Sequence, residues 1–109
     1  MTPAIYQENL NEMVDAIVKT GLAQKIIVFG SYARNELAPD SDIDICVLTN
    51  DLSRPKIEVT YDIRHAISRL QKVPVDVLVF QPQLFIERAN AINSIEKEIY
   101  TKGVTVYEQ

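Results

Sequence analysis

The feature that most constrains this chain is a pair of aspartates inside an otherwise apolar run. In the segment VFGSYARNELAPDSDIDICVL, residues 28–48, a Gly-Ser dipeptide is followed after ten residues by Asp42 and Asp44. The run around them is built of Ile, Cys, Val and Leu, which is typical of a buried strand, where charged side chains are rare unless they are paired. A bound cation would remove this conflict. The pattern therefore predicts a fold that gathers acidic groups around an ion.

The predicted elements alternate between helix and strand along the chain. Apolar residues recur at helical spacing over residues 5–18, and Gly21 is expected to end that helix. Strands are predicted over residues 25–29, 42–48, 75–80 and 104–107, and helices over residues 32–37, 55–72 and 82–102, with a loop at 38–41 and a helix break at 90–93. This order predicts an α+β fold, a small mixed sheet with helices packed on one face.

The helix predicted over residues 55–72 has an apolar row that is expected to face the core. Its members are Ile57, Tyr61, Ile63, Ile67 and Leu70. Pro55 suits the first turn of this helix because its missing N–H is not needed there.

Length, charge and composition limit the classes of partner. With 109 residues, the chain is expected to form a single domain over residues 1–109. The formal net charge is −4, without a cluster of Lys and Arg, which argues against direct nucleic-acid binding. No apolar run approaches the roughly 18 residues of a membrane span, and the first residues lack the pattern of a secretion signal. With Cys46 as its single cysteine, the chain is predicted to be cytoplasmic, without an internal disulfide.

Strand alternation predicts that three aspartates share one face of the sheet. Side chains alternate between faces, so Asp42 and Asp44 lie opposite their branched neighbours, and the same count applies to Asp76 in the later strand. If the branched residues pack under the helices, all three carboxylates lie on the uncovered face and raise one another's pKa. Mg²⁺ is commonly held by one or two carboxylates together with substrate phosphates. We therefore expect these aspartates to be metal ligands, although Asp76 alone could be an edge charge that discourages aggregation.

The Gly-Ser turn is expected to bind phosphate. Gly30 and Ser31 stand where a strand gives way to a helical turn, whose free N–H groups attract phosphate. Gly30 lets the backbone approach a ligand, while Ser31 can donate its hydroxyl to a phosphate oxygen or cap the short helix. Arg34, one turn further on, would contact a phosphate or an aspartate, or face solvent. Cys46 is expected to be a small buried filler, because a thiol beside oxygen ligands makes a poor Mg²⁺ site.

These motifs resemble the polymerase-beta-type nucleotidyltransferase superfamily. Its pattern is Gly-Ser, ten residues, Asp-x-Asp and a third Asp on a later strand, met here by Gly30, Ser31, Asp42, Asp44 and Asp76. The chain is most similar to the minimal nucleotidyltransferases (MNT proteins), antitoxins that are paired with HEPN toxins. This resemblance covers nearly the whole chain, including the terminal KGVTVYE. One departure is Asn35, where relatives usually carry Gly, and Asn is the residue best able to replace Gly in a left-handed conformation.

The resemblance implies a reaction and a partner. AMP would pass from ATP with Mg²⁺ to a tyrosine hydroxyl of a HEPN ribonuclease toxin, with pyrophosphate leaving, and the modification would silence the toxin. Asp42 and Asp44 would hold two metal ions, which stabilise the entering and leaving oxygens. Asp76 would bind the second ion, or accept the hydroxyl proton, or both. Larger relatives carry a further acceptor-binding domain, so we expect the partner protein to supply the acceptor surface in a heteromeric complex.

A second interpretation is a binding module without catalysis. The chain would then neutralise the toxin by contact, and its nucleotide pocket would be vestigial or regulatory. The three aspartates favour catalysis, because a pure binder has no reason to gather like charges. Transfer to a small molecule such as an aminoglycoside is disfavoured, since the acceptor domain of those enzymes is missing.

Overall fold

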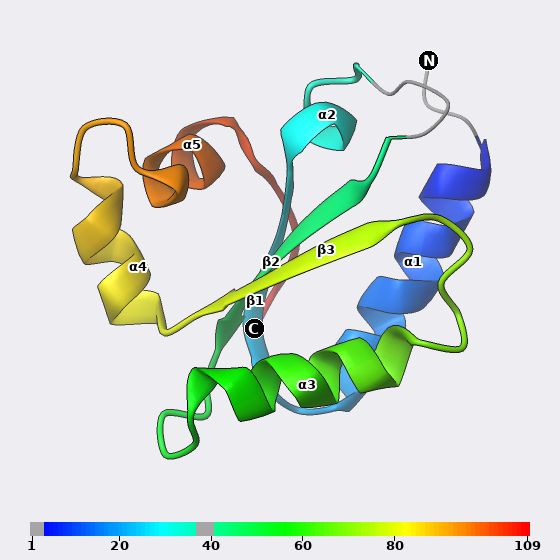
Figure 1. The fold of residues 1–109 in the computed structure, drawn as a ribbon, viewed down its shortest axis with the longest axis horizontal. Coiled ribbons are helices and arrows are strands. Elements are labelled where there is room, and N and C mark those ends of the chain that lie inside the picture. The colour runs from blue at the N-terminus through cyan, green and yellow to red at the C-terminus, as the bar shows by residue number, and fades with distance from the viewer. Residues whose placement is uncertain (1–3, 37–40) are drawn as a thin grey trace.

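The computed structural model describes residues 4–36 and 41–109. Its elements are α1 (Ala4–Lys19), β1 (Ala23–Phe29), α2 (Gly30–Ala33), β2 (Ile43–Thr49), α3 (Lys56–Ile67), β3 (Val75–Phe80), α4 (Pro82–Ala89), α5 (Ile95–Lys102) and β4 (Val104–Glu108). The predicted mixed α+β fold is confirmed, including the helix break that separates α4 from α5 (Figure 1). Most of the loop predicted at 38–41 lies outside the described residues. None of the described helices is long and apolar enough to cross a membrane.

The strand order β3-β2-β1-β4 brings three strand ends together. β1 is antiparallel to β2 and to β4, whereas β2 and β3 are parallel, with α3 as the crossover between them. The start of β2, the start of β3 and the end of β1 therefore meet at one end of the sheet. The Gly-Ser turn follows β1 at that end, and the strands that carry the predicted carboxylates begin there.

Helices cover both faces of the sheet, which corrects the expectation that they pack on one face. α1 and α3 cover the face of the branched residues through a cluster that includes Met13, Ile45 and Ile63. α4 and α5 cover the other face through a second cluster that includes Cys46 and Phe85 (Figure 1). The physical reason is that β2 and β3 become apolar beyond their aspartates, and that surface must also be removed from water. The aspartates therefore lie at one end of a covered face and not on a bare face.

The predicted inner face of α3 is correct only in part. Ile63 and Ile67 are buried and Val59 lies in line with them, whereas Ile57 is 78% exposed and Tyr61 is 67% exposed. α3 carries two apolar rows with the same four-residue spacing. The longer, aliphatic row faces the sheet because it buries more apolar surface there. Tyr61 keeps its hydroxyl in water on the outer side, and the helix ends earlier than predicted.

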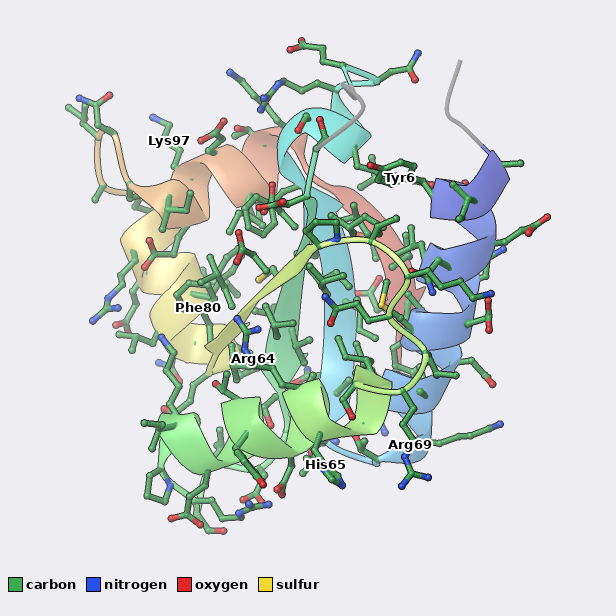
Figure 2. The ribbon with its side chains drawn as sticks, turned by 45° about the vertical axis from the view of Figure 1, so that its right-hand side comes forward. Tyr6, Arg64, His65, Arg69, Phe80 and Lys97 are labelled. Atoms are coloured by element: carbon green, nitrogen blue, oxygen red, sulfur yellow. The ribbon has the colours of Figure 1, made fainter. Side chains whose placement is uncertain are left out.

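α1 holds the two segments that surround the start of β2. The Tyr6 hydroxyl donates a hydrogen bond to the Ser41 carbonyl at 3.0 Å, just before β2. The Tyr32 hydroxyl, from α2, donates to Oε1 of Gln7 at 2.6 Å. Figure 2 shows Tyr6 at the end of α1 that lies next to α2. α1 therefore ties both the turn after β1 and the beginning of β2 to one rigid helix.

The hydrogen bond between Tyr32 and Gln7 leads to a small expected effect on stability. Tyr32→Phe keeps the ring but removes the donor, and we expect the free energy of unfolding to fall by about 0.5–1 kcal/mol. Urea unfolding followed by circular dichroism measures this change. Tyr100→Phe is the matched control, because Tyr100 is 64% exposed and its hydroxyl bonds to no residue that the structure describes. Equal midpoints for the two variants would show that the bond contributes nothing.

Candidate active site

Two of the predicted carboxylates lie side by side on neighbouring strands. In the parallel register of β2 and β3, Asp44 is the direct partner of Asp76. In the antiparallel register of β1 and β2, Asp44 is also opposite Phe29, the residue before Gly30. Neighbouring strands are about 4.8 Å apart, so side chains at partnered positions on one face are close neighbours. The shared face predicted from strand alternation is therefore confirmed for Asp44 and Asp76, whereas Asp42 lies just before β2, which begins one residue later than predicted.

The surroundings of Asp44 disfavour its negative charge. Loss of contact with water raises the pKa of Asp44, and the charges of Asp76 and Asp42 raise it further. The positive charge of Arg34 acts in the opposite direction on the same pKa. Asp42 and Asp76 are exposed, while Asp44 is half-buried. The three predicted carboxylates and Arg34 thus lie within electrostatic reach of one another.

Gly30 packs directly against the Asp44 carboxylate. Its φ of +72° lies in the left-handed region that favours glycine. A Cβ at this position would overlap Oδ2 of Asp44. The sequence predicted that this glycine makes room for a ligand, whereas the structure shows that it makes room for a carboxylate of the site.

The turn after β1 differs from the prediction in where its helix begins. α2 starts at Gly30, so Ser31 lies inside it and not at its cap, and the N-cap Phe29 makes no side-chain capping bond. Within the described part of the chain, no residue hydrogen-bonds to the Ser31 hydroxyl. Asn35 adopts φ 58°, the left-handed conformation expected for this substitute of glycine. The turn therefore keeps its shape, and the Ser31 hydroxyl is not used for capping.

Arg34 lies between two glutamates. Its Nε is 3.4 Å from Oε2 of Glu36, and its Nη1 is 3.6 Å from Oε1 of Glu98. Glu98 belongs to α5, far along the chain, and the sequence analysis did not single it out. No local pattern distinguishes it from other acidic residues on a helix surface, so only the packing of α5 could reveal the contact. The sequence left a phosphate, an aspartate or solvent open for Arg34, whereas the structure shows contacts to two glutamates and an electrostatic effect on Asp44.

Cys46 shares the aspartate face without being a candidate ligand. Its side chain is fully buried, and burial raises the pKa of the thiol to about 12, so it stays protonated at neutral pH. This confirms the buried filler expected from the sequence. Over residues 4–36 and 41–109, no group of three or more His, Cys, Asp or Glu side chains is placed so that it could hold a metal ion. The aspartates are neighbours, but the described residues do not provide a complete set of metal ligands.

Known proteins are similar to this chain in sequence. The family described as "Nucleotidyltransferase domain" matches residues 9–101. Over 105 residues the chain is 29% identical to "Putative protein adenylyltransferase MJ0604" of Methanocaldococcus jannaschii, an alignment that covers 93% of this chain and 97% of that protein.

Two solved structures have a similar fold. One is described as a "putative nucleotidyltransferase" from Sulfolobus solfataricus, with a TM-score of 0.60 and 20% identity, covering 94% of this chain and 79% of that one. The other is described as a "toxin-antitoxin with AMP-PNP", with a TM-score of 0.53 and 19% identity, covering 90% and 73%. At these identities the likeness concerns the fold alone. Because the family match extends over residues 9–101, the chain belongs to the nucleotidyltransferase domain family.

Proposed function

We propose that this chain transfers AMP from ATP to a tyrosine hydroxyl of a partner HEPN ribonuclease toxin and thereby acts as its antitoxin. The observation that carries the proposal is the placement of Asp44 beside Asp76 and against Gly30, at the start of two parallel strands. Membership of the nucleotidyltransferase family supports it. Further support comes from a relative named as a protein adenylyltransferase and from a similar fold in a toxin–antitoxin structure with AMP-PNP.

The acidic groups of the site fit Mg²⁺. This ion takes oxygen ligands and is usually held by one or two carboxylates together with substrate phosphates. Asp44 and Asp76 would supply the carboxylates, with Asp42 just before the strand of Asp44. Because the described residues form no complete three-ligand group, phosphate oxygens would complete the coordination. One or two bound Mg²⁺ ions would stabilise the negative charge that develops on the phosphates during transfer.

The residues around the carboxylates would position the two reactants. Backbone N–H groups of the Gly-Ser turn, the Ser31 hydroxyl and the Arg34 guanidinium would bind the triphosphate. Asp76 would accept the proton of the tyrosine hydroxyl. The tyrosine oxygen then bonds to the α-phosphorus as the bond to the bridging oxygen breaks, and pyrophosphate leaves with that electron pair. Positioning and charge stabilisation supply most of the rate in such transfers, which a small domain can provide.

Label transfer tests this proposal directly. The protein is incubated with Mg²⁺, ATP labelled at the α-phosphate and the product of the neighbouring gene, which the proposal expects to be the HEPN toxin. We expect label on a tyrosine of the toxin, located by mass spectrometry, together with loss of its ribonuclease activity. ATP labelled at the γ-phosphate should leave the toxin unlabelled, which distinguishes AMP transfer from phosphorylation. Neutralisation without label, retained when Asp42→Asn and Asp44→Asn are combined, would instead favour inhibition by contact.

A further inference from the structure

We propose that Glu98 is a positioning residue that holds the Arg34 side chain ready for the triphosphate, an inference that rests on the proposed function. Glu98 lies on α5 and Arg34 directly follows α2, and the two helices are adjacent at the same end of the sheet (Figure 1). The contact between Oε1 of Glu98 and Nη1 of Arg34, at 3.6 Å, connects α5 to the residue that follows α2. Figure 2 shows α5 next to α2 from a second direction, with the neighbouring Lys97 labelled.

The contacts of the Arg34 guanidinium leave one of its nitrogens for a ligand. Nε is engaged by Glu36 and Nη1 by Glu98, whereas Nη2 makes no ion pair with any described residue. The guanidinium is a planar fork with five donors, so two anchors on different nitrogens fix the plane and the direction of the remaining donors. A long side chain that is already held loses less rotamer freedom when the ligand arrives.

Glu98 is the firmer of the two anchors because α5 is fixed to the rest of the fold. Glu96, only 5% exposed, lies 3.6 Å from Arg88 of α4, and Ile99 is fully buried in the second cluster. Glu36, by contrast, lies two residues from Arg34 on the same turn and moves with it. Of these two anchors, Glu98 is therefore the one that holds the Arg34 guanidinium from a separate element of the fold.

Because the Arg34–Glu98 pair is partly exposed, a role in positioning can be distinguished from a role in folding stability. The side chains of Arg34 and Glu98 are 39% and 44% exposed. Exposed ion pairs contribute little to folding stability, so loss of Glu98 should leave the unfolding midpoint almost unchanged. Its effect should appear in nucleotide binding, where the direction of the guanidinium matters.

Nucleotide binding by Glu98 variants is the experiment. Calorimetry measures the Kd of the Mg²⁺ complex of α,β-methylene-ATP, whose α–β linkage is not cleaved in the transfer. We expect Glu98→Ala to raise this Kd about two- to tenfold, the range expected when one long side chain must be ordered on binding. Glu98→Asp, which keeps the carboxylate, should recover part of the loss. Glu87→Ala is the matched control, because Glu87 is an exposed carboxylate on α4 without an ion pair to a described residue.

A double-mutant cycle shows whether Glu98 acts through Arg34. In the Arg34→Ala background, Glu98→Ala should add no further loss. In the transfer assay, Glu98→Ala should raise the KM for ATP and leave kcat nearly unchanged. Equal losses in both Arg34 backgrounds would overturn the proposal. Tighter binding by Glu98→Ala would also overturn it, because Glu98 would then only compete with the nucleotide for Arg34.

The wild-type measurement separates this inference from the proposed function. If the wild-type chain does not bind the Mg²⁺–nucleotide complex, the proposed function itself is wrong. If the wild-type chain binds it and the Glu98 variants bind equally well, only the positioning role is wrong.

Discussion

Asp44→Asn is expected to lower the rate of AMP transfer by at least about 10³-fold while making the folded chain slightly more stable. The amide keeps the shape of the side chain but removes the negative charge that would hold the cation beside Asp76. Label transfer to the toxin measures the rate. Opposite effects on activity and stability are typical of groups that a fold keeps for function at a cost in stability.

The sign of the stability effect follows from the raised pKa of Asp44. Burial and the neighbouring carboxylates disfavour its ionised form in the folded state. A carboxyl group with a raised folded-state pKa adds stability that is fully present below its ordinary pKa, about 3.9, and that is lost as the pH rises through the raised pKa. At pH values above the raised pKa, where Asp44 is ionised, its charge is unfavourable in the folded state, and Asn removes it. Because Asp44 is only half-buried, solvent screening limits the gain in unfolding free energy to about 1 kcal/mol or less.

Asp62→Asn is a control whose expected effects on AMP transfer and on stability are opposite to those of Asp44→Asn. Oδ2 of Asp62, in the middle of α3, lies 2.7 Å from Nη2 of Arg54, which precedes that helix. Replacing the Asp62 carboxylate by an amide should leave AMP transfer intact and lower the unfolding free energy by up to about 1 kcal/mol. If AMP transfer survives Asp44→Asn, the Asp44 carboxylate has no part in the mechanism. A lower unfolding free energy for Asp44→Asn at pH 7 would contradict the electrostatic description of the site.

The sequence predicts that Asp44 and Asp76 share one face because their placement depends on local geometry. Alternation along a strand decides which face Asp44 and Asp76 take, and the helix predicted between their strands is compatible with the crossover that parallel strands need. The left-handed Asn35 likewise follows from what a single residue can adopt. The strand faces and the Asn35 conformation depend on only one or two neighbouring elements, so the sequence pattern is sufficient to predict them.

The features that the sequence does not predict depend on packing between distant elements. α3 offers two apolar rows of equal spacing, and only contact with the sheet selects Val59 over Ile57. The helical pattern of α4 and α5 does not say which face of the sheet they cover. The Glu98 contact with Arg34 follows from that choice of face. Even at Gly30, the sequence indicates a close approach, but only the strand register identifies Asp44 as the group that approaches.

Gly30→Ala is expected to lower the free energy of unfolding by about 2–4 kcal/mol and to reduce AMP transfer strongly. The left-handed backbone alone costs an alanine about 1–2 kcal/mol. The added Cβ would also overlap Oδ2 of Asp44, which forces the carboxylate away from its position beside Asp76. Urea unfolding and label transfer on the same preparation measure the two effects.

Gly21→Ala separates the backbone cost from the contact with Asp44. Gly21 has nearly the same φ, +74°, yet a Cβ there meets nothing within 4 Å, so this variant should lose only the backbone contribution. Combining Gly30→Ala with Asp44→Ala should restore part of the stability, because Cβ of Asp44 is 3.5 Å from the added carbon, an ordinary contact. Transfer should stay lost in the combined variant, since the carboxylate is gone. If Gly21→Ala and Gly30→Ala are equally destabilised, the carboxylate is not what requires glycine at the turn, and the site must be arranged differently.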